Sequence, residues 1–259
     1  MTDVQSRLTF DGQPVGAPAL RFEGIEMVFP DGTHALRETT FDVCPGEFVT
    51  IVGPSGCGKS TLLRIASGLN PQTGGLLDVD RSRIGYVFQD ATLLQWRTVQ
   101  RNVELLAELE GMPKAERRRR ASDAISTVGL SGSEDKYPKQ LSGGMKMRAS
   151  LARSLVLEPS VFLFDEPFAA VDEITRERLN DEVITLFQRS GFAGLFITHS
   201  ITEAVFLSTR VLVMSARPGT IVGDFTVPFE YPRSPELRFD PNFAHLCGEV
   251  SHTLRGAHA

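Results

Sequence analysis

The stretch Gly-Pro-Ser-Gly-Cys-Gly-Lys-Ser at residues 53–60 leaves few folds open to this chain, because it matches the spacing G-x-x-x-x-G-K-S. Glycines let successive backbone N–H groups curl around an anion, and a following helix directs its positive N-terminal end at the same anion. Lys59 supplies a cation for β- and γ-phosphates, and the Ser60 hydroxyl can ligate Mg²⁺. Because an apolar strand over 47–52 precedes the stretch and a helix over 62–69 follows it, we predict a phosphate-binding loop, called the phosphate loop below.

A second motif ends another apolar run. Four apolar residues at 161–164 are followed by Asp165 and Glu166. A buried strand would deliver Asp165 beside the phosphate loop, where a carboxylate can hold Mg²⁺ through water, and would place Glu166 to polarise an attacking water. An acid at a strand end is, in isolation, as often a helix cap. The phosphate loop favours the catalytic interpretation.

The remaining apolar patterns predict an α/β fold. Continuous apolar runs indicate strands covered on both faces, and such runs lie at 84–88, 161–164, 194–198 and 211–214. Two β-like runs, at 20–29 and 34–43, flank the turn signal Pro-Asp-Gly. Apolar residues at helical spacing predict helices around Val99-Val103-Leu106, Ala121-Ile125-Val128 and Leu179-Val183-Leu186.

Composition excludes several classes of function. The 259 residues carry a formal charge of −5, so the basic footprint of a nucleic-acid-binding protein is absent, and we expect no nucleic-acid partner. Three cysteines without zinc-site spacing favour a reduced compartment over a disulfide framework. The N-terminus lacks the pattern of a signal peptide, and no apolar run approaches the roughly 18 residues of a membrane-spanning helix. Any membrane role is expected to come through a partner.

A third motif, Leu-Ser-Gly-Gly at 141–144, precedes a helix that runs to about residue 157. Ser142 can cap that helix, and the two glycines expose its N-terminal N–H groups to an anion. An ordinary helix cap is the simpler interpretation of these residues alone. Their position between the two nucleotide motifs favours a second phosphate-binding helix end.

Together these motifs resemble those of the ATP-binding subunits of ABC transporters, from about residue 20 to the C-terminus. Residues 53–60 resemble the Walker A loop, 162–165 the Walker B strand with Glu166 as catalytic glutamate, and 141–145 the signature motif. The resemblance implies an α/β fold of the ABC type of P-loop NTPase. Its parts are a mainly parallel sheet core, an antiparallel β subdomain and an inserted helical subdomain.

The resemblance also implies a domain organisation. We expect a flexible N-terminal arm at 1–18, an ABC ATPase domain at 19–230 and a C-terminal tail at 231–259. The helical subdomain is expected at about 90–158, where helical patterns interrupt the predicted strands.

Further residues acquire roles through the resemblance. Phe29 matches the aromatic that stacks on adenine, the alternative being a core residue at a strand end. Gln89 matches the Q-loop glutamine that senses Mg²⁺ and the attacking water. Asp172, in the run Ala-Ala-Val-Asp, matches the D-loop aspartate at a dimer seam. His199 matches the switch histidine that contacts the γ-phosphate, the alternative being a structural histidine.

The implied site residues form four groups. The ATP-contacting residues are Phe29, Gly53, Pro54, Ser55, Gly56, Cys57, Gly58, Lys59, Ser60 and Thr61. The catalytic residues are Glu166, His199 and Gln89. The ligands of Mg²⁺ are Ser60, Gln89 and Asp165. The contacts to the ATP of an opposite subunit are Ser142, Gly143, Gly144 and Asp172.

The resemblance implies partners as well. Two copies would face each other head to tail, with each ATP between the Walker A loop of one copy and the signature motif of the other. Hydrolysis of ATP would power transport by transmembrane permease subunits, which an extracytoplasmic solute-binding protein serves indirectly. The expected location is therefore peripheral, at the cytoplasmic face of the cell membrane.

A finer resemblance points to importers of nitrate, sulfonate, taurine and related small solutes. It rests on Leu-Gln-Trp-Arg-Thr-Val at 94–99 and Ser-Ala-Arg-Pro-Gly at 215–219. The chain departs from that pattern at Gln95, Val171 and Ser200, where the importers usually carry Pro, Leu and Asp. The alternative is a soluble ABC ATPase of an assembly scaffold, such as that of iron–sulfur clusters.

Cys57 lies inside the phosphate loop, two residues before Lys59. A nearby cation and a helix N-terminus favour the thiolate, so we predict a solvent-accessible, reactive thiol that Mg-ATP would cover. The alternative is a side chain that points away from the nucleotide and fills space.

Overall fold

The computed structural model describes residue 9 and residues 16–257, so the predicted arm lies largely outside the described residues. The strands are β1 (Leu20–Val28), β2 (His34–Val43), β3 (Phe48–Val52), β4 (Gly74–Val79), β5 (Ile84–Val87), β6 (Val161–Asp165), β7 (Ala193–Ile197), β8 (Arg210–Met214) and β9 (Ile221–Thr226). The α-helices are α1 (Lys59–Ala66), α2 (Val99–Val103), α3 (Leu105–Leu109), α4 (Lys114–Thr127), α5 (Gly143–Leu155), α6 (Glu173–Ser190), α7 (Ile201–Leu207) and α8 (Pro241–Gly256). Short 3-10 helices lie at Arg81–Arg83, Pro138–Gln140 and Pro235–Phe239. None of the helices in these described ranges is long and apolar enough to cross a membrane.

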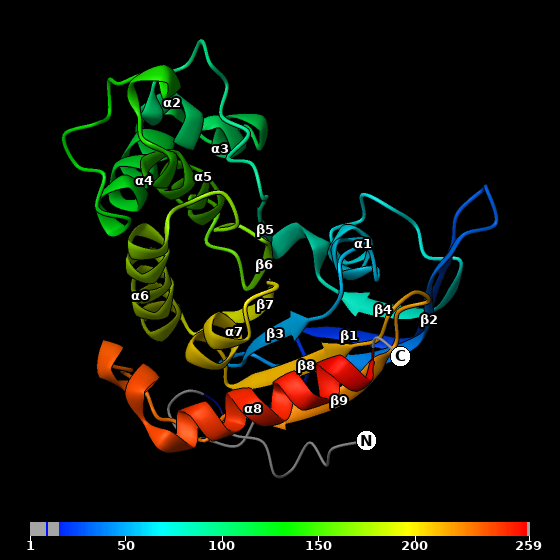
Figure 1. The fold of residues 1–259 in the computed structure, drawn as a ribbon. Helices are drawn as coiled ribbons and strands as arrows, with labels where there is room; N and C mark the ends of the chain where they lie inside the picture. The colour runs from blue at the N-terminus through cyan, green and yellow to red at the C-terminus, as the bar shows by residue number, and fades with distance from the viewer. Residues whose placement is uncertain (1–8, 10–15, 258–259) are drawn as a thin grey trace.

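A mainly parallel sheet forms the centre of the molecule, with strands in the order β5-β6-β7-β3-β8-β9 (Figure 1). Strand β9 alone pairs antiparallel, with β8. Every residue of β3, β6, β7 and β8 is buried, which confirms the prediction of strands covered on both faces for the runs at 161–164, 194–198 and 211–214. The prediction is wrong for the run at 84–88, because β5 lies at the sheet edge and alternates between buried and half-buried residues. Side chains of β3 alternate between two apolar clusters, with Phe48 and Val52 in one and Val49 and Ile51 in the other.

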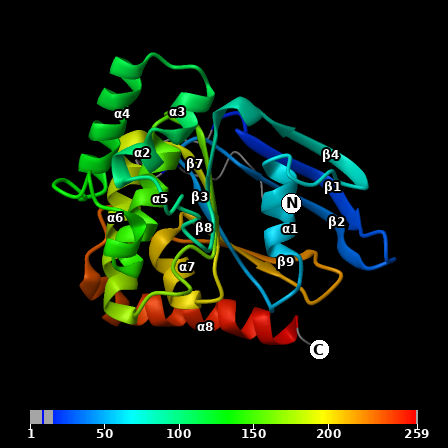
Figure 2. The ribbon, with the colours of Figure 1, turned by 90° about the horizontal axis from the view of Figure 1, so that it is seen from above.

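Different elements cover the two faces. Helix α1 and a three-stranded antiparallel sheet, in the order β2-β1-β4, pack on the face of Val49. Helices α5, α6, α7 and α8 pack on the opposite face, where the ring centroids of Phe48, Phe164 and Phe196 lie 5.5–5.9 Å apart. Both views show α2, α3 and α4 gathered beside α5, at the end of the molecule remote from the antiparallel sheet (Figures 1 and 2).

The sheet brings distant segments to one edge, because the carboxyl ends of parallel strands meet there. The phosphate loop follows β3, Asp165 ends β6, Gln89 follows β5, and His199 follows β7. Strands β5, β6, β7 and β3 are consecutive neighbours in the sheet, so these four segments lie next to one another.

Several predicted boundaries are wrong. The helix predicted over 62–69 begins at Lys59 and ends at Ala66, shortly before Gly68 turns left-handed at φ 80°. The helix predicted from Val99, Val103 and Leu106 consists of two short helices that meet at Glu104.

Strands β4 and β9 and helix α7 are among the elements missing from the sequence analysis. Strands β4 and β9 lie at sheet edges and are partly exposed, so they lack a continuous apolar run. Helix α7 follows the pattern Ser-x-x-Glu at 200–203, which is typical of a helix start and was an available signal.

Candidate active site

The phosphate loop joins β3 to α1 and encloses the ammonium group of Lys59. Gly58 adopts φ 109°, and a side-chain carbon there would lie 2.7 Å from Leu36 Cδ2, so glycine is required. Lys59 is 5% exposed, and its Nζ donates hydrogen bonds to the carbonyls of Gly53 at 2.9 Å and Pro54 at 2.8 Å. The loop backbone therefore holds the lysine charge at its centre.

Asp165 lies beside the first turn of α1, and both of its carboxylate oxygens accept hydrogen bonds. Ser60 Oγ donates to Oδ1 at 2.7 Å, and Tyr86 Oη donates to Oδ2 at 3.2 Å. Burial, followed by the charge of Asp165, raises the pKa of the Tyr86 phenol, so Tyr86 remains a donor. Sequence reasoning missed Tyr86. Its place on β5, three residues before Gln89, was the available signal.

Glu166 is directed by an unusual backbone conformation. Its φ of 45° is left-handed, although it is not a glycine, and its N–H donates to the Ile197 carbonyl of β7 at 3.1 Å. Its Oε2 lies 3.6 Å from His199 Nδ1. Strained backbone of this kind clusters at functional sites. The turn after β6 and the loop after β7 thus bring this acid and this histidine together.

A cavity of about 390 Å³ gathers half of the predicted site residues. Its lining includes Phe29, Ser55, Gly56, Gly58, Lys59, Ser60, Thr61, Gln89 and Glu166. Phe29 is half-buried and also packs on the apolar cluster around α1, as the core interpretation expects, whereas its stacking on adenine stays a prediction. His199 lines a smaller cavity that shares Glu166 with this one.

Arg217 also lines the larger cavity, and sequence reasoning did not assign it to the site. Its guanidinium donates two hydrogen bonds, of 2.9 and 3.1 Å, to the Gly56 carbonyl. The run Ser-Ala-Arg-Pro-Gly at 215–219 had been singled out only for its resemblance to importers. Arg217 adds a second cation at the rim of the phosphate loop.

The residues of the signature motif and Asp172 lie together, away from this cavity. Ser142 caps α5 by accepting a hydrogen bond from the Met145 N–H at 3.3 Å. A side-chain carbon on Gly144 would lie 2.8 Å from Thr175 Cγ2, so the start of α5 packs closely on α6. Asp172 caps α6 through the Thr175 N–H at 3.0 Å, and this bond lowers the pKa of Asp172. None of Ser142, Gly143, Gly144 and Asp172 lines the cavity.

The segment after Gln89 is tied to helix α5. Arg153, which is 7% exposed, donates hydrogen bonds to the carbonyls of Ala91 at 3.1 Å and Thr92 at 2.9 Å. Thr92 adopts φ 47°, so a side chain of α5 stabilises a strained turn close to Gln89. The helix that begins at Ser142 therefore also supports the Gln89 segment.

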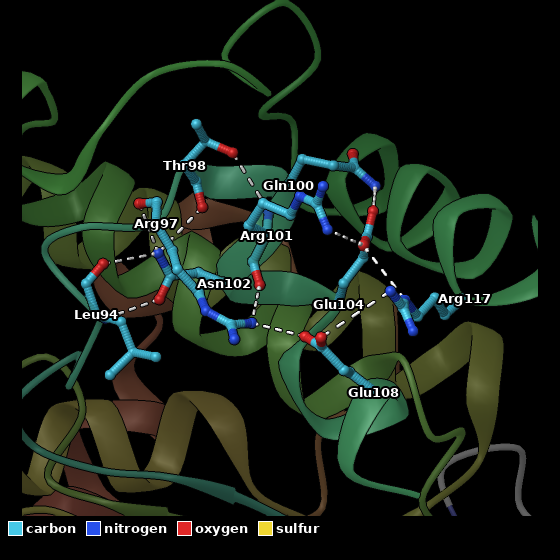
Figure 3. A network of polar contacts seen from close by, with 9 residues as sticks. All are labelled: Leu94, Arg97, Thr98, Gln100, Arg101, Asn102, Glu104, Glu108 and Arg117. Carbon is cyan, nitrogen blue, oxygen red and sulfur yellow. Dashed lines mark hydrogen bonds and ion pairs between the residues drawn. The ribbon is translucent and has the colours of Figure 1, made fainter. Parts of the chain in front are cut away.

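A buried asparagine organises the next loop, residues 94–98 (Figure 3). Asn102 is fully buried, accepts from the Leu94 N–H at 2.7 Å, and donates to the carbonyls of Leu94, Arg97 and Thr98 at 3.0–3.1 Å. Arg97 reaches out of the loop to Glu108 at 2.7 Å (Figure 3). Trp96 is 74% exposed on this loop, so the network presents a large aromatic side chain to the surface.

Ser200 stands where the importers usually carry Asp, and it still caps a helix. Ser200 Oγ caps α7 by accepting from the Glu203 N–H at 3.3 Å. Serine and aspartate are both favoured at this position, so the exchange of Asp for Ser leaves the helix start intact.

The expectation of a reactive Cys57 is wrong. The side chain is 1% exposed, and Sγ lies 3.8 Å from Lys59 Nζ. Burial raises the pKa of the Cys57 thiol, and this effect exceeds the opposing effect of Lys59. The side chain points into the core, as the alternative interpretation had it, and Cys57 does not line the cavity.

The family model and the relatives that match this chain all point to the same protein family. Residues 36–169 match the family described as ABC transporter. The chain is 43% identical over 235 residues to the nitrate import ATP-binding protein NrtD of Synechocystis, covering 86% of this chain and 88% of the relative. It is 42% identical over 227 residues to the aliphatic sulfonates import ATP-binding protein SsuB 1 of Pseudomonas savastanoi, covering 88% and 92%. It is 39% identical over 233 residues to the taurine import ATP-binding protein TauB of Rhizobium johnstonii, covering 85% and 89%.

Solved structures share the fold. The protein cbiO1 from Clostridium perfringens, part of the ABC transporter complex cbiONQ, matches with a TM-score of 0.76 at 26% identity, covering 88% of this chain and 93% of that one. The ATP-binding cassette MJ0796, in a dimeric post-hydrolysis state bound to ADP and Pi, matches with a TM-score of 0.72 at 29% identity, covering 81% and 99%.

Proposed function

This chain belongs to the ABC transporter family, and from that membership we propose that it is the ATP-binding and ATP-hydrolysing subunit of an importer. The relatives described above carry names for the import of nitrate, aliphatic sulfonates and taurine. These names support a small anion or a related compound as the transported solute. They do not support the iron–sulfur scaffold alternative.

One observation carries the catalytic part of the proposal: a cavity whose lining combines the phosphate loop, Phe29, Gln89 and Glu166. Lys59 neutralises the β- and γ-phosphates of ATP, and backbone N–H groups of the loop surround them. Phe29 stacks on the adenine. Glu166 polarises the attacking water, and His199, 3.6 Å from it, contacts the γ-phosphate.

The residues beside the loop fit Mg²⁺. The Ser60 hydroxyl and the Asp165 carboxylate are hard oxygen donors with their oxygens 2.7 Å apart. Gln89 offers an amide oxygen on the same cavity. Bound there, Mg²⁺ supplies charge neutralisation on the phosphates, while Ser60, Asp165 and Gln89 hold it.

The proposed assembly contains two copies of this chain and a permease. Ser142, Gly143 and Asp172 are exposed and lie apart from the cavity, which supports their contact with the ATP of the opposite copy. Gly144 is buried behind them. The dimeric state of the MJ0796 cassette supports the same arrangement. The permease subunits hold the dimer at the cytoplasmic face of the membrane, and an extracytoplasmic solute-binding protein delivers the solute to them.

A comparison of Glu166→Gln with Lys59→Ala tests the proposal. We expect the wild-type protein to hydrolyse Mg-ATP. Glu166→Gln should retain ATP affinity and lose turnover by about 100-fold or more, because it removes the group that polarises water. Lys59→Ala should lose both. Turnover is measured by phosphate release and affinity by calorimetry. Near-wild-type turnover in Glu166→Gln would contradict the role of Glu166, and failure to co-purify with a multi-span membrane protein would contradict the importer assignment.

A further inference from the structure

Three hydrogen bonds enclose the backbone around His199. The Thr198 hydroxyl donates to Glu203 Oε2, the Ser200 N–H donates to Thr198 Oγ1 at 3.0 Å, and the Glu203 N–H donates to Ser200 Oγ at 3.3 Å. The residue before His199 and the residue after it are therefore both bonded to Glu203. We call Thr198, Ser200 and Glu203 the Glu203 network.

Glu203 is an acid in a buried position. It is 7% exposed in the first turn of α7, and burial raises its pKa, whereas the Thr198 hydroxyl and then the Arg176 charge lower it. A buried carboxyl group is costly unless it is hydrogen-bonded, so its presence calls for an explanation. Glu203 also borders a cavity of about 10 Å³ that is shared with Glu166 and His199.

The orientation of His199 depends on its backbone. The His199 side chain is 62% exposed, and its Nδ1 lies 3.6 Å from Glu166 Oε2. Little packing surrounds an imidazole that is so exposed, so the direction of its Cα–Cβ bond limits which positions the ring can reach through its rotamers. That direction is set by residues 198–200, which the Glu203 network holds.

We propose that Glu203 is a positioning residue that holds the backbone on both sides of His199 and keeps its imidazole directed at Glu166. The inference rests on the proposed role of His199 at the γ-phosphate. Glu203 acts on turnover through His199 alone. Nucleotide binding by the phosphate loop and Phe29 does not depend on it, because neither belongs to the cavity that Glu203 borders.

Three substitutions separate this role from a general effect on folding. Thr198→Val removes the hydroxyl at nearly constant volume, Glu203→Ala removes the acceptor, and Glu203→Gln keeps an oxygen that can accept from Thr198. We expect the first two to lower kcat by about 10- to 100-fold, with the KM for ATP and the affinity for ADP within about twofold of wild type. Glu203→Gln should restore most of the rate. If the Glu203→Ala variant does not fold, Thr198→Val still tests the proposal, because it removes the same hydrogen bond.

A double-mutant cycle provides the decisive measurement. In a His199→Ala background, Thr198→Val should cause no further loss of kcat, since its effect passes through His199. Glu47→Gln is the matched control. Glu47 is 1% exposed and accepts from the Cys44 N–H at 2.8 Å at the far end of β3, so its effect should be the same in both backgrounds.

The outcomes distinguish this inference from the proposed function. Equal losses by Thr198→Val in both backgrounds, or a loss of ADP affinity that parallels the loss of kcat, would overturn the role of Glu203. If kcat falls in His199→Ala but stays at the wild-type value in Thr198→Val, the inference about Glu203 is contradicted and the proposed role of His199 is not. A wild-type rate in His199→Ala contradicts the role proposed for His199 itself, and the inference about Glu203 then falls with it.

Discussion

Three charged side chains in or beside the cavity, Lys59, Asp165 and Glu166, are each oriented by a different kind of contact. Lys59 donates to backbone carbonyls, Asp165 accepts from two hydroxyl groups, and Glu166 follows a left-handed turn. Fixed groups of this kind need little reorganisation when charge develops during a reaction. The contacts that orient these groups are therefore as important for the proposed activity as the charged groups themselves.

Tyr86→Phe tests one such contact. It removes only the hydroxyl that donates to Asp165 Oδ2. We expect the Mg²⁺ concentration for half-maximal hydrolysis to rise by about tenfold, as for other partners that orient metal ligands. Calorimetric titration of Mn²⁺ into the ATP-bound protein should show the same loss without relying on activity. Tyr137→Phe, at a residue that is 41% exposed, is the control. Equal effects of the two substitutions would contradict the role of Tyr86.

Helix α5 connects two parts of the proposed mechanism. It begins at Ser142, in the signature motif, and carries Arg153, which holds the carbonyls of Ala91 and Thr92 beside Gln89. The same region contains the loop 94–98, which Asn102 fixes from α2. Displacement of the Gln89 segment is thus mechanically linked to α5 and to the surface that carries Trp96.

Asn102→Ala should make the loop 94–98, which carries Trp96, more mobile. Four hydrogen bonds to the backbone of 94–98 are lost, and buried polar groups left without partners lower stability by about 2–4 kcal/mol in total. Denaturant titration measures that loss, and hydrogen exchange should rise mainly in 94–98. Thr98→Ala, which removes the α2 cap, is the control and should lower stability by only about 1 kcal/mol. Unchanged exchange in 94–98 would contradict the role of Asn102.

Motifs that depend on local spacing were predictable, and contacts between distant segments were not. The phosphate loop, the strand before Asp165 and the Ser142 cap each follow from a few consecutive residues. Tyr86 and Arg217 reach the site through the sheet and a late loop. Spacing placed Tyr86 near Gln89, but it did not show that either side chain contacts the site. Cys57 shows the limit most clearly, because the sequence places it beside a cation but does not reveal that its side chain points into the core.

The molecule presents two separate functional surfaces. The phosphate loop and Glu166 line the cavity, whereas Ser142 and Asp172 lie where α5 meets α6. The signature residues line no part of their own chain's cavity, so their proposed contact with ATP would need a second copy. Each site in the proposed dimer therefore takes residues from both chains.

Mixing two inactive variants tests this arrangement. Ser142→Arg and Lys59→Ala should each abolish hydrolysis, but their heterodimer contains one site with both defects and one with neither. We expect equal mixing to restore up to about a quarter of the wild-type rate if subunits exchange freely. Lys59→Ala mixed with Glu166→Gln is the control, because each site then keeps one defect. Recovery in both mixtures, or in neither, would contradict independent sites formed in trans.

The left-handed backbone of Glu166 lowers the stability of the protein at a residue that is proposed to be needed for activity. A non-glycine residue in this conformation is destabilised by about 1–2 kcal/mol, and at Glu166 the strain falls on the residue proposed to activate water. Glu166→Gly should therefore raise the denaturation midpoint of the protein while abolishing hydrolysis, whereas Glu166→Gln should abolish hydrolysis at unchanged stability. A lower midpoint for Glu166→Gly would contradict this expectation. Glycine would be the more stable residue at this position, so the glutamate is explained by the catalytic role proposed for it and not by stability.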